Sequence, residues 1–231
     1  FLVGDVAGKG LSASIFMAVS KALAKSAAVR HPDDDVGTWM TTVNREISRD
    51  NTEALFVTAF AGILDLDSGD LVYCNAGHDA PYCVGAASGL RRLVAGDGPP
   101  LCTVDDFEYH GEHTFLDPGE LVVLVTDGVT DMRDPTGAMY GRARMEAVLE
   151  GRPQKPYMVY RAMIRDGHGH DLRTSHNIIK GLGESGLVDV AVGLAVGGGD
   201  DFGQVDPDAI GISRELIGQG DVDVAIGGLR E

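Results

Sequence analysis

The chain has 231 residues, of which 44% are hydrophobic, so it can bury one or two ordinary cores. Thirty-five acidic residues against nineteen basic ones give a formal net charge of -16, and a field of that sign repels phosphodiester backbones and anionic lipid. Composition and charge therefore exclude a disordered tail and argue against nucleic acid or a membrane as a partner. No apolar run approaches the roughly eighteen residues of a membrane span, so a cytoplasmic protein is expected.

The first elements predicted along the chain are a strand and two helices. Residues 1–5 predict an apolar strand that ends in Asp5, and a glycine-bearing turn follows over residues 6–10. Because the chain opens inside this strand, we expect the N-terminal part of the domain to be missing. Two amphipathic helices come next, with apolar residues at helical spacing: Leu11, Ile15, Val19 and Leu23, and then Val36, Met40, Val43 and Ile47.

From Leu55 the hydrophobic period changes to that of strands. The runs LFVTAFAGILDLD and DLVYCNAG, separated by a turn at Ser68 and Gly69, predict a β-hairpin. Further short strands are expected near Tyr82, Leu90 and Phe107. The run ELVVLVTDGV predicts a fully buried strand that ends in Asp127, and YGRARMEAVLE predicts a helix. An antiparallel sheet with flanking helices fills residues 1–150.

Glycine becomes dense after Gly151, and the predicted elements shorten. We place a domain or subdomain boundary at residues 151–156. Beyond it, predicted strands (157–164, 188–196, 209–212 and 222–229) alternate with predicted helices (176–184 and 213–217), an α/β rhythm. Residues 151–231 are therefore either a divergent end of the first domain or a small α/β module of their own.

Two predicted strands end in an aspartate that a turn follows, Asp5 in VGDVAGKG and Asp127 in VTDGVTD. A strand fixes its last residue rigidly, and a following glycine allows close approach of the backbone to a ligand. Hard divalent cations such as Mg²⁺ and Mn²⁺ prefer carboxylate, carbonyl and water oxygens. The alternative for either aspartate alone is a helix cap or a turn residue.

Four segments taken in order resemble a known family: GDVAGKGLSASIFMA, FVTAFAGILDLDSGDLVYCNAGHDAP, GDGPPL and LDPGELVVLVTDGVTDMRDPTGAMYGRARMEAVL. They are similar to the PPM-type protein phosphatases, in the bacterial branch typified by sporulation stage II protein E. The resemblance runs over residues 1–150. It implies an α+β fold, an α-β-β-α sandwich of two antiparallel sheets flanked by helices.

The resemblance also implies a chemistry, the hydrolysis of phosphoserine or phosphothreonine by a water that bridges two divalent ions, Mg²⁺ or Mn²⁺. In that family, aspartates at the positions of Asp5 and Asp127 bind metal, and the residue at Val6 contributes its backbone carbonyl. The usual substrate of the branch is a phosphorylated regulatory protein such as an anti-sigma-factor antagonist. Sensor domains often lie upstream.

This sequence departs from the family's pattern at two places. A metal-binding aspartate lies upstream of the family's GDV loop, and this chain starts too late to contain it. The family also ends in a D-D-[IV]-T strand, for which DVDVAIGGLRE is the nearest match, so Asp221 and Asp223 are the candidate ligands. Their rivals are Asp189, Asp200 and Asp201. These departures motivate an alternative to the phosphatase, a non-catalytic regulatory or binding module with an incomplete metal site.

Other polar residues in the motifs have a structural interpretation beside the functional one. His78 in NAGH is a candidate general acid, but a turn or core histidine is the favoured interpretation. Asp131 and Asp134 are expected in a solvated turn, with a helper role at the metal site as the alternative.

The C-terminal segment also bears a faint resemblance to the cobalamin-binding module. Residues 166–168 supply the D-x-H of a D-x-H-x-x-G motif, but Asp171 stands where the glycine is required. We therefore interpret His168 and His170 as loop residues.

Overall fold

The computed structural model describes residues 1–8, 10–30, 34–49, 51–65, 67–93, 96–131, 133–151, 176–182, 189–196 and 224–227. The helices within these residues are α1 Gly10–Arg30, α2 Val36–Ser48, α3 Asp127–Thr130 and α4 Arg142–Glu150. The strands are β1 Leu2–Val6, β2 Val57–Leu64, β3 Asp70–Ala76, β4 Tyr82–Gly85, β5 Gly89–Arg92, β6 Asp97–Gly98, β7 Glu112–Phe115, β8 Leu121–Leu124, β9 His176–Leu182, β10 Asp189–Val196 and β11 Val224–Gly227.

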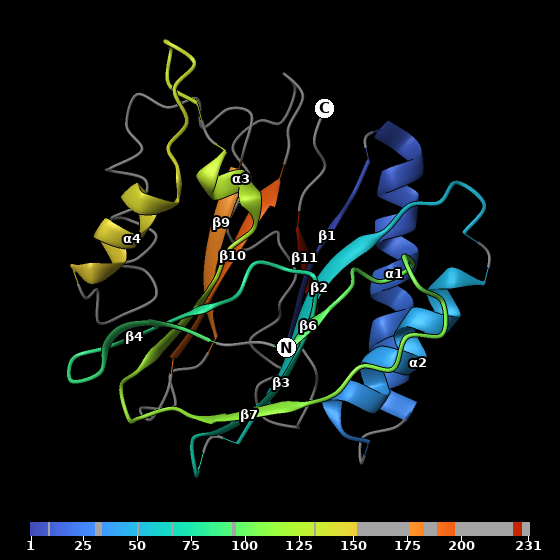
Figure 1. Ribbon diagram of the computed structural model, residues 1–231, viewed down its shortest axis with the longest axis horizontal. Coiled ribbons are helices and arrows are strands. Elements are labelled where there is room, and N and C mark those ends of the chain that lie inside the picture. Colours follow the sequence, from blue (N-terminus) through green and yellow to red (C-terminus); the bar gives the residue numbers. More distant parts are fainter. Residues whose placement is uncertain are drawn as a thin grey trace.

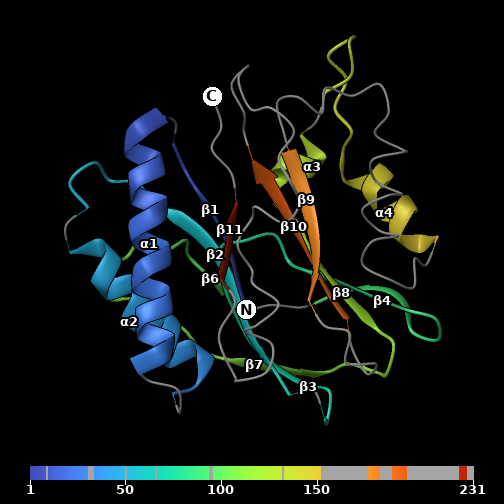
Figure 2. The ribbon, with the colours of Figure 1, turned by 180° about the vertical axis from the view of Figure 1, so that it is seen from behind.

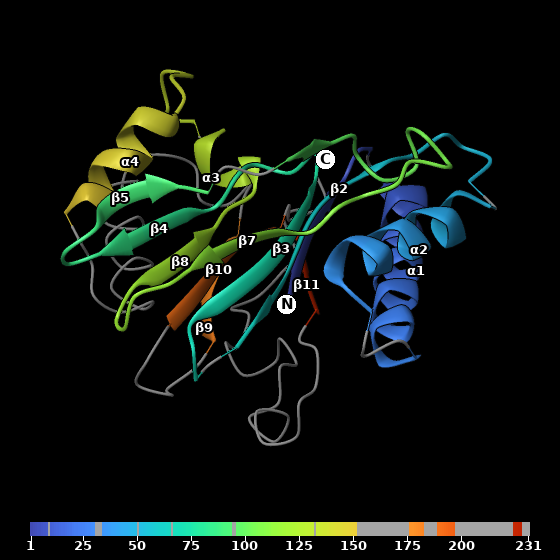
Figure 3. The ribbon, with the colours of Figure 1, turned by 60° about the horizontal axis from the view of Figure 1, so that its bottom comes forward.

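The strands form two sheets, and helices cover their outer faces (Figure 1). The first sheet has the strand order β11-β1-β2-β3-β6, with β7 paired to β3. The second has the order β5-β4-β8-β10-β9. Helices α1 and α2 lie beside the first sheet, and α3 and α4 lie beside the second (Figures 1 and 3). This arrangement confirms the predicted α-β-β-α sandwich.

The alternation of side chains along β1 shows how one strand serves two apolar layers. Val3 packs between the sheets with Phe60 of β2 and Leu124 of β8. Leu2 and Val6 belong to the layer between the first sheet and helices α1 and α2. A strand buried on both faces needs apolar residues at successive positions, which explains the unbroken run at the start of the chain.

Helix α2 follows the amphipathic pattern predicted for it. Its N-cap is Asp35, whose carboxylate accepts hydrogen bonds from the backbone N–H groups of Gly37 (2.9 Å) and Thr38 (3.2 Å). These bonds satisfy donors that have no partner inside the helix. The apolar residues that predicted the helix are all buried: Val36, Met40, Val43 and Ile47.

Helix α1 differs from its prediction in the face that it buries. Leu11 and Ile15 are 76% and 55% exposed, and Val19 is exposed as well. The fully buried residues are small: Ala13, Ser20, Ala24 and Ala27. Leu23, the fourth predicted residue, is half-buried and packs against the core, as Phe16 and Met17 do. Small side chains allow the helix to approach its neighbours closely, and the indole N–H of Trp39 in α2 donates to the Ala24 carbonyl at 3.2 Å. Among the described residues, no helix has both the length and the apolar character that crossing a bilayer requires.

Three strand pairings are parallel rather than antiparallel. They join β1 to β11, β3 to β6, and β8 to β10. Parallel neighbours need a long crossover connection, and the chain between β8 and β10 includes α3 and α4. The pairings of β10 and β11 place strands from residues 189–227 in both sheets (Figure 2).

Several predictions for single elements need correction. Residues 176–182 form β9, paired antiparallel to β10, and not the predicted helix; the two successive isoleucines favour a strand once a partner is present. The strand expected near Phe107 is wrong, because the strand in this region is β7, at residues 112–115. The strands predicted at 188–196 and 222–229 correspond to β10 and β11. Elements predicted at 157–164, 209–212 and 213–217 lie outside the described residues.

Candidate active site

Asp5 lies in β1, one residue before the strand ends. Both neighbouring strands hold it, because its backbone is paired with Thr58 of β2 and with Gly227 of β11. The chain then turns at Gly8, whose φ of 130° belongs to a region that glycine adopts most readily. A central strand and a tight turn therefore fix the Asp5 carboxylate at one end of the first sheet.

Asp127 comes from the second sheet, but by a different route from the one predicted. Strand β8 ends at Leu124, and Asp127 is the first residue of the four-residue helix α3, so the predicted strand end at Asp127 is wrong. Thr126 has an extended backbone and a buried side chain, and it leads from the strand into the helix. The Asp131 N–H donates to the Asp127 carbonyl at 2.8 Å, which closes the single turn.

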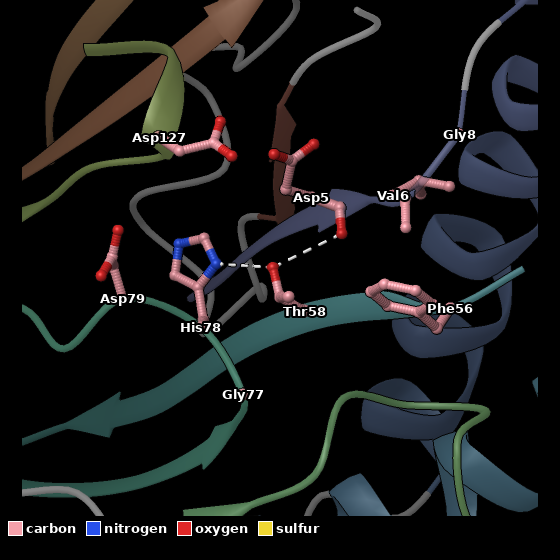
Figure 4. A pocket seen from close by; sticks show the side chains of 10 residues that line it. Asp5, Val6, Gly8, Phe56, Thr58, Gly77, His78, Asp79 and Asp127 are labelled. Atoms are coloured by element: carbon pink, nitrogen blue, oxygen red, sulfur yellow. Dashed lines mark hydrogen bonds between the residues drawn. The ribbon is translucent and has the colours of Figure 1, made fainter. Parts of the chain in front are cut away.

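The two aspartates line one cleft of about 550 Å³. In Figure 4 their carboxylates point toward the same space from opposite sides, Asp5 from the first sheet and Asp127 from the second. The cleft is lined by the backbone or side chains of Asp5, Val6, Ala7, Gly8, Phe56, Thr58, Gly77, His78, Asp79 and Asp127. The structure thus brings together three of the predicted site residues, Asp5, Val6 and Asp127.

The turn that carries His78 forms the floor of this cleft. The Asn75 side chain accepts from the His78 N–H at 2.8 Å and donates to the His78 carbonyl at 2.9 Å. Gly77 has a φ of 70°, and a Cβ at this position would lie 2.7 Å from Pro100. Only glycine fits here without strain, so the NAGH sequence encodes the shape of the turn.

The imidazole of His78 is 7% exposed, and its Nδ1 lies 2.9 Å from the Thr58 hydroxyl. Burial lowers the pKa of His78 to about 4, although Asp79, Asp127 and the Val125 backbone favour the charged ring. The ring is therefore neutral near pH 7 and holds no extra proton that it could give to a leaving group. This supports the structural interpretation of His78 over the general acid.

Asp79 adds a third carboxylate to the cleft, and its position depends on α4. The Arg142 guanidinium, at the start of α4, donates to Asp79 Oδ1 at 2.8 Å. About a third of the Asp79 side chain is exposed, so this pair lies at the rim of the cleft, where water screens it.

The oxygen-rich lining fits a hard divalent cation. Carboxylates on facing elements and the backbone carbonyl of Val6 are the donors that Mg²⁺ and Mn²⁺ prefer, and both ions commonly keep several waters. Within the part of the chain that the structure describes, no three His, Cys, Asp or Glu side chains gather into a group that could hold a metal ion by themselves. The described lining therefore offers oxygen donors for such a cation at Asp5, Val6 and Asp127.

Of the remaining candidate ligands, only Asp189 lies within the residues that the structure describes. Asp221 and Asp223, and their rivals Asp200 and Asp201, lie outside the described residues, as do His168 and His170. Asp189 begins β10 and is paired with Leu121, at the end of β8 remote from Asp127. The β11 residue beside Asp5 is Gly227. Asp134 belongs to a turn, where its carboxylate accepts from the N–H groups of Thr136 (2.8 Å) and Ala138 (3.0 Å).

Comparison with known proteins identifies the family. The sequence pattern of the family described as Stage II sporulation protein E (SpoIIE) matches residues 1–173, well over half of the chain. The chain belongs to this family. The resemblance seen in the sequence motifs is therefore confirmed.

Two curated proteins are similar to this SpoIIE-family chain. Protein IcfG of Synechocystis sp. (strain ATCC 27184 / PCC 6803 / Kazusa) is 29% identical over 175 residues, which cover 64% of this chain and 27% of that protein. Phosphoserine phosphatase RsbU of Bacillus subtilis (strain 168) is 26% identical over 137 residues, which cover 58% of this chain and 40% of that protein. The match thus spans less than half the length of either relative.

Among solved structures, the SiaA-PP2C domain of Pseudomonas aeruginosa has a TM-score of 0.59 and 17% sequence identity to this chain. The match covers 72% of this chain and 67% of that one. At this identity the likeness shows the fold alone, and it agrees with the two-sheet sandwich described above.

Sequence reasoning missed two polar residues of the cleft, Thr58 and Asp79. Thr58 stands in the run FVTAF, where alternation indicates a strand residue but not what the residue faces. Asp79 directly follows NAGH and could have been found from its place beside that signature. The role of Thr58 depends on the register between β1 and β2, which no local pattern reveals.

Proposed function

We propose that this SpoIIE-family domain hydrolyses phosphoserine or phosphothreonine on a protein, using water activated by divalent metal ions. The observation that carries the proposal is the pair of aspartates, Asp5 and Asp127, that enter one cleft from two different sheets. The likeness to a relative named a phosphoserine phosphatase supports the same reaction.

The residues of the cleft have distinct roles in this proposal. Asp5, Asp127 and the Val6 carbonyl would hold the ions, two in number and either Mg²⁺ or Mn²⁺, and Asp221 or Asp223 would complete the set. When bound, such ions lower the pKa of water and neutralise charge on the transferring phosphoryl group. Phe56 gives the cleft an apolar wall, and the neutral His78 adds no positive charge that would compete with a cation.

The proposed substrate is a phosphorylated regulatory protein, such as an anti-sigma-factor antagonist. The proposal rests on the family's branch and on the likeness to RsbU. The net charge of -16 disfavours nucleic acid as a partner. A cytoplasmic location, an upstream sensor domain and a boundary near residue 151 stay predictions.

The test is Mn²⁺-dependent hydrolysis of a phosphoserine peptide by the 231-residue chain. We expect turnover that chelation abolishes and that Asp127→Asn lowers by at least about 10²-fold, because a metal centre contributes several kcal/mol to the transition state. Asp106→Asn is the matched control, since this side chain is 94% exposed and lies outside the cleft. Equal turnover in the Asp127→Asn variant and the wild type would contradict the proposal.

A second candidate function is a non-catalytic regulatory or binding module. It is favoured by the absence, among the described residues, of a group of three side chains that could hold a metal ion. This candidate predicts a folded chain that binds a phosphorylated peptide without releasing phosphate at any Mn²⁺ concentration. Phosphate release that depends on Asp127 would exclude it.

A further inference from the structure

His78 lies on the segment that connects the two sheets. It follows β3 of the first sheet by two residues and precedes β4 of the second. Figure 4 shows its ring below the carboxylate of Asp127, with Thr58 between the ring and Asp5. A side chain in this place can affect how far apart the two sheets hold their aspartates.

The surrounding turn leaves the ring little freedom. Both backbone polar groups of His78 are hydrogen-bonded to the Asn75 side chain, and the residue is buried. Gly77 lies against Pro100, so the backbone before His78 cannot shift toward it. The imidazole is thus a rigid group whose direction the turn determines.

The ring reaches Asp5 through one intermediate side chain. Its Nδ1 lies 2.9 Å from the Thr58 hydroxyl, and that hydroxyl donates to the backbone carbonyl of Asp5 at 3.4 Å. Thr58 and Asp5 are also register partners on adjacent strands, so the side-chain contact reinforces the backbone pairing of β1 with β2. The chain of contacts runs from the connection between the sheets to the candidate ligand Asp5.

We propose that His78 is a positioning residue for a divalent cation: acting through Thr58, it fixes the Asp5 end of β1 relative to Asp127. This inference rests on the proposed function, because the cation is the one that the proposed reaction requires. Groups that orient the ligands of a metal commonly change its affinity by about 10- to 100-fold when they are removed. A histidine that only filled space in the turn would contribute to folding and leave cation affinity unchanged.

The test measures Mn²⁺ binding by titration calorimetry on the 231-residue chain. His78→Gln places an amide near the position of Nε2, and His78→Asn places one near the position of Nδ1. We expect His78→Gln and Thr58→Val to raise the Kd for Mn²⁺ about 10-fold or more, and His78→Asn to stay within about threefold of the wild type. Thr114→Val is the matched control, a half-buried strand threonine outside the cleft.

A double variant and a melting curve separate positioning from folding. If Thr58 relays the effect of His78, Thr58→Val combined with His78→Gln raises the Kd no further than either change alone. Additive losses of affinity would overturn the proposal. So would unchanged Mn²⁺ affinity in His78→Gln, or a loss that appears only in variants whose metal-free form is already unfolded.

The readout also distinguishes this inference from the proposed function. Turnover by the wild type with no change of Kd in the variants overturns the positioning role and leaves the phosphatase activity standing. The expected pattern of Kd values without any turnover supports the positioning role and contradicts the activity. A wild-type chain that binds no Mn²⁺ overturns both.

Discussion

The floor of the cleft and its surroundings are stabilised by different kinds of interaction. In the first sheet the contacts near Asp5 are hydrogen bonds among neutral groups: Asn75, His78 and Thr58. On the side of the second sheet the contacts are ion pairs: Arg91 with Glu120 at the end of β8 remote from Asp127, and Arg142 of α4 with Asp79 at the rim of the cleft. The groups that lie beside the carboxylates of Asp5 and Asp127 are neutral and add no charge there. The ion pairs lie at the rim of the cleft or farther away.

The pair of Arg91 and Glu120 lies at the end of β8 remote from Asp127. Glu120 is 2% exposed and accepts from Arg91 at 3.0 and 3.1 Å and from Ser88 at 3.0 Å. Burial raises the pKa of Glu120, but the hydrogen bonds from Arg91 and Ser88 outweigh it and lower the pKa below its ordinary value. The Glu120 carboxylate is thus a buried charge whose stability depends on its partner.

The largest expected effect comes from removing that partner. Arg91→Met leaves Glu120 charged and buried, and we expect it to lower the free energy of unfolding by about 3 kcal/mol or more. Arg142→Met breaks the pair at the rim, where both side chains are exposed by about a third or more, and should cost less than about 1 kcal/mol. Urea unfolding of both variants tests the difference. Equal losses of unfolding free energy in the two variants would contradict the expected difference between the buried pair and the rim pair.

The next largest effect is a pH dependence of the free energy of unfolding, which arises from His78 at the floor of the cleft. The pKa of His78 is lowered from 6.5 to about 4 in the folded protein. Stability from this group is therefore fully present above pH 6.5 and is lost as the pH falls toward 4, by on the order of 3 kcal/mol. Metal-free His78→Asn should show a flatter unfolding profile across this range. The exposed His113→Asn is the control, and a wild-type slope in His78→Asn would refute the assignment.

The smallest effect concerns the turn that carries His78. Gly77 and Gly89 have nearly the same φ, 70° and 73°, but a Cβ at Gly77 would meet Pro100 at 2.7 Å and one at Gly89 would meet nothing within 4 Å. Gly89→Ala should therefore show the backbone cost alone, about 1 kcal/mol, and Gly77→Ala about 1 to 2 kcal/mol more. Thermal unfolding measures both. Equal melting temperatures would show that the turn can move away from Pro100.

The parts of the fold that local patterns encode were predictable from the sequence. The apolar run before Asp5, the hairpin of β2 and β3 and the buried face of α2 follow from hydrophobic period and turn residues. The motif containing Asp127 drew attention to a residue that the structure places in the cleft, although Val125 and Thr126 separate it from β8.

The rest depends on contacts between distant residues. Residues 176–182 have a helical pattern in isolation, yet β10 supplies a partner strand for them. Leu11 and Ile15 mark α1 as amphipathic, but the close approach of its alanines decides which face is buried. Thr58 becomes a site residue through its register with Asp5. The hydrophobic period of a segment carries no information about its strand partner, its register or the neighbour that its helix approaches.

The pairing of β1 with β11 has a consequence for the order in which the protein can fold. Leu2 is the register partner of Val224, so the strand that bears Asp5 is synthesised long before its neighbour on that side. A contact of such separation closes late, because loop closure costs entropy before the contact forms. During synthesis the open edge of β1 can pair with other chains. The strand that holds the candidate ligand is therefore the one whose correct burial most depends on the last part of the chain.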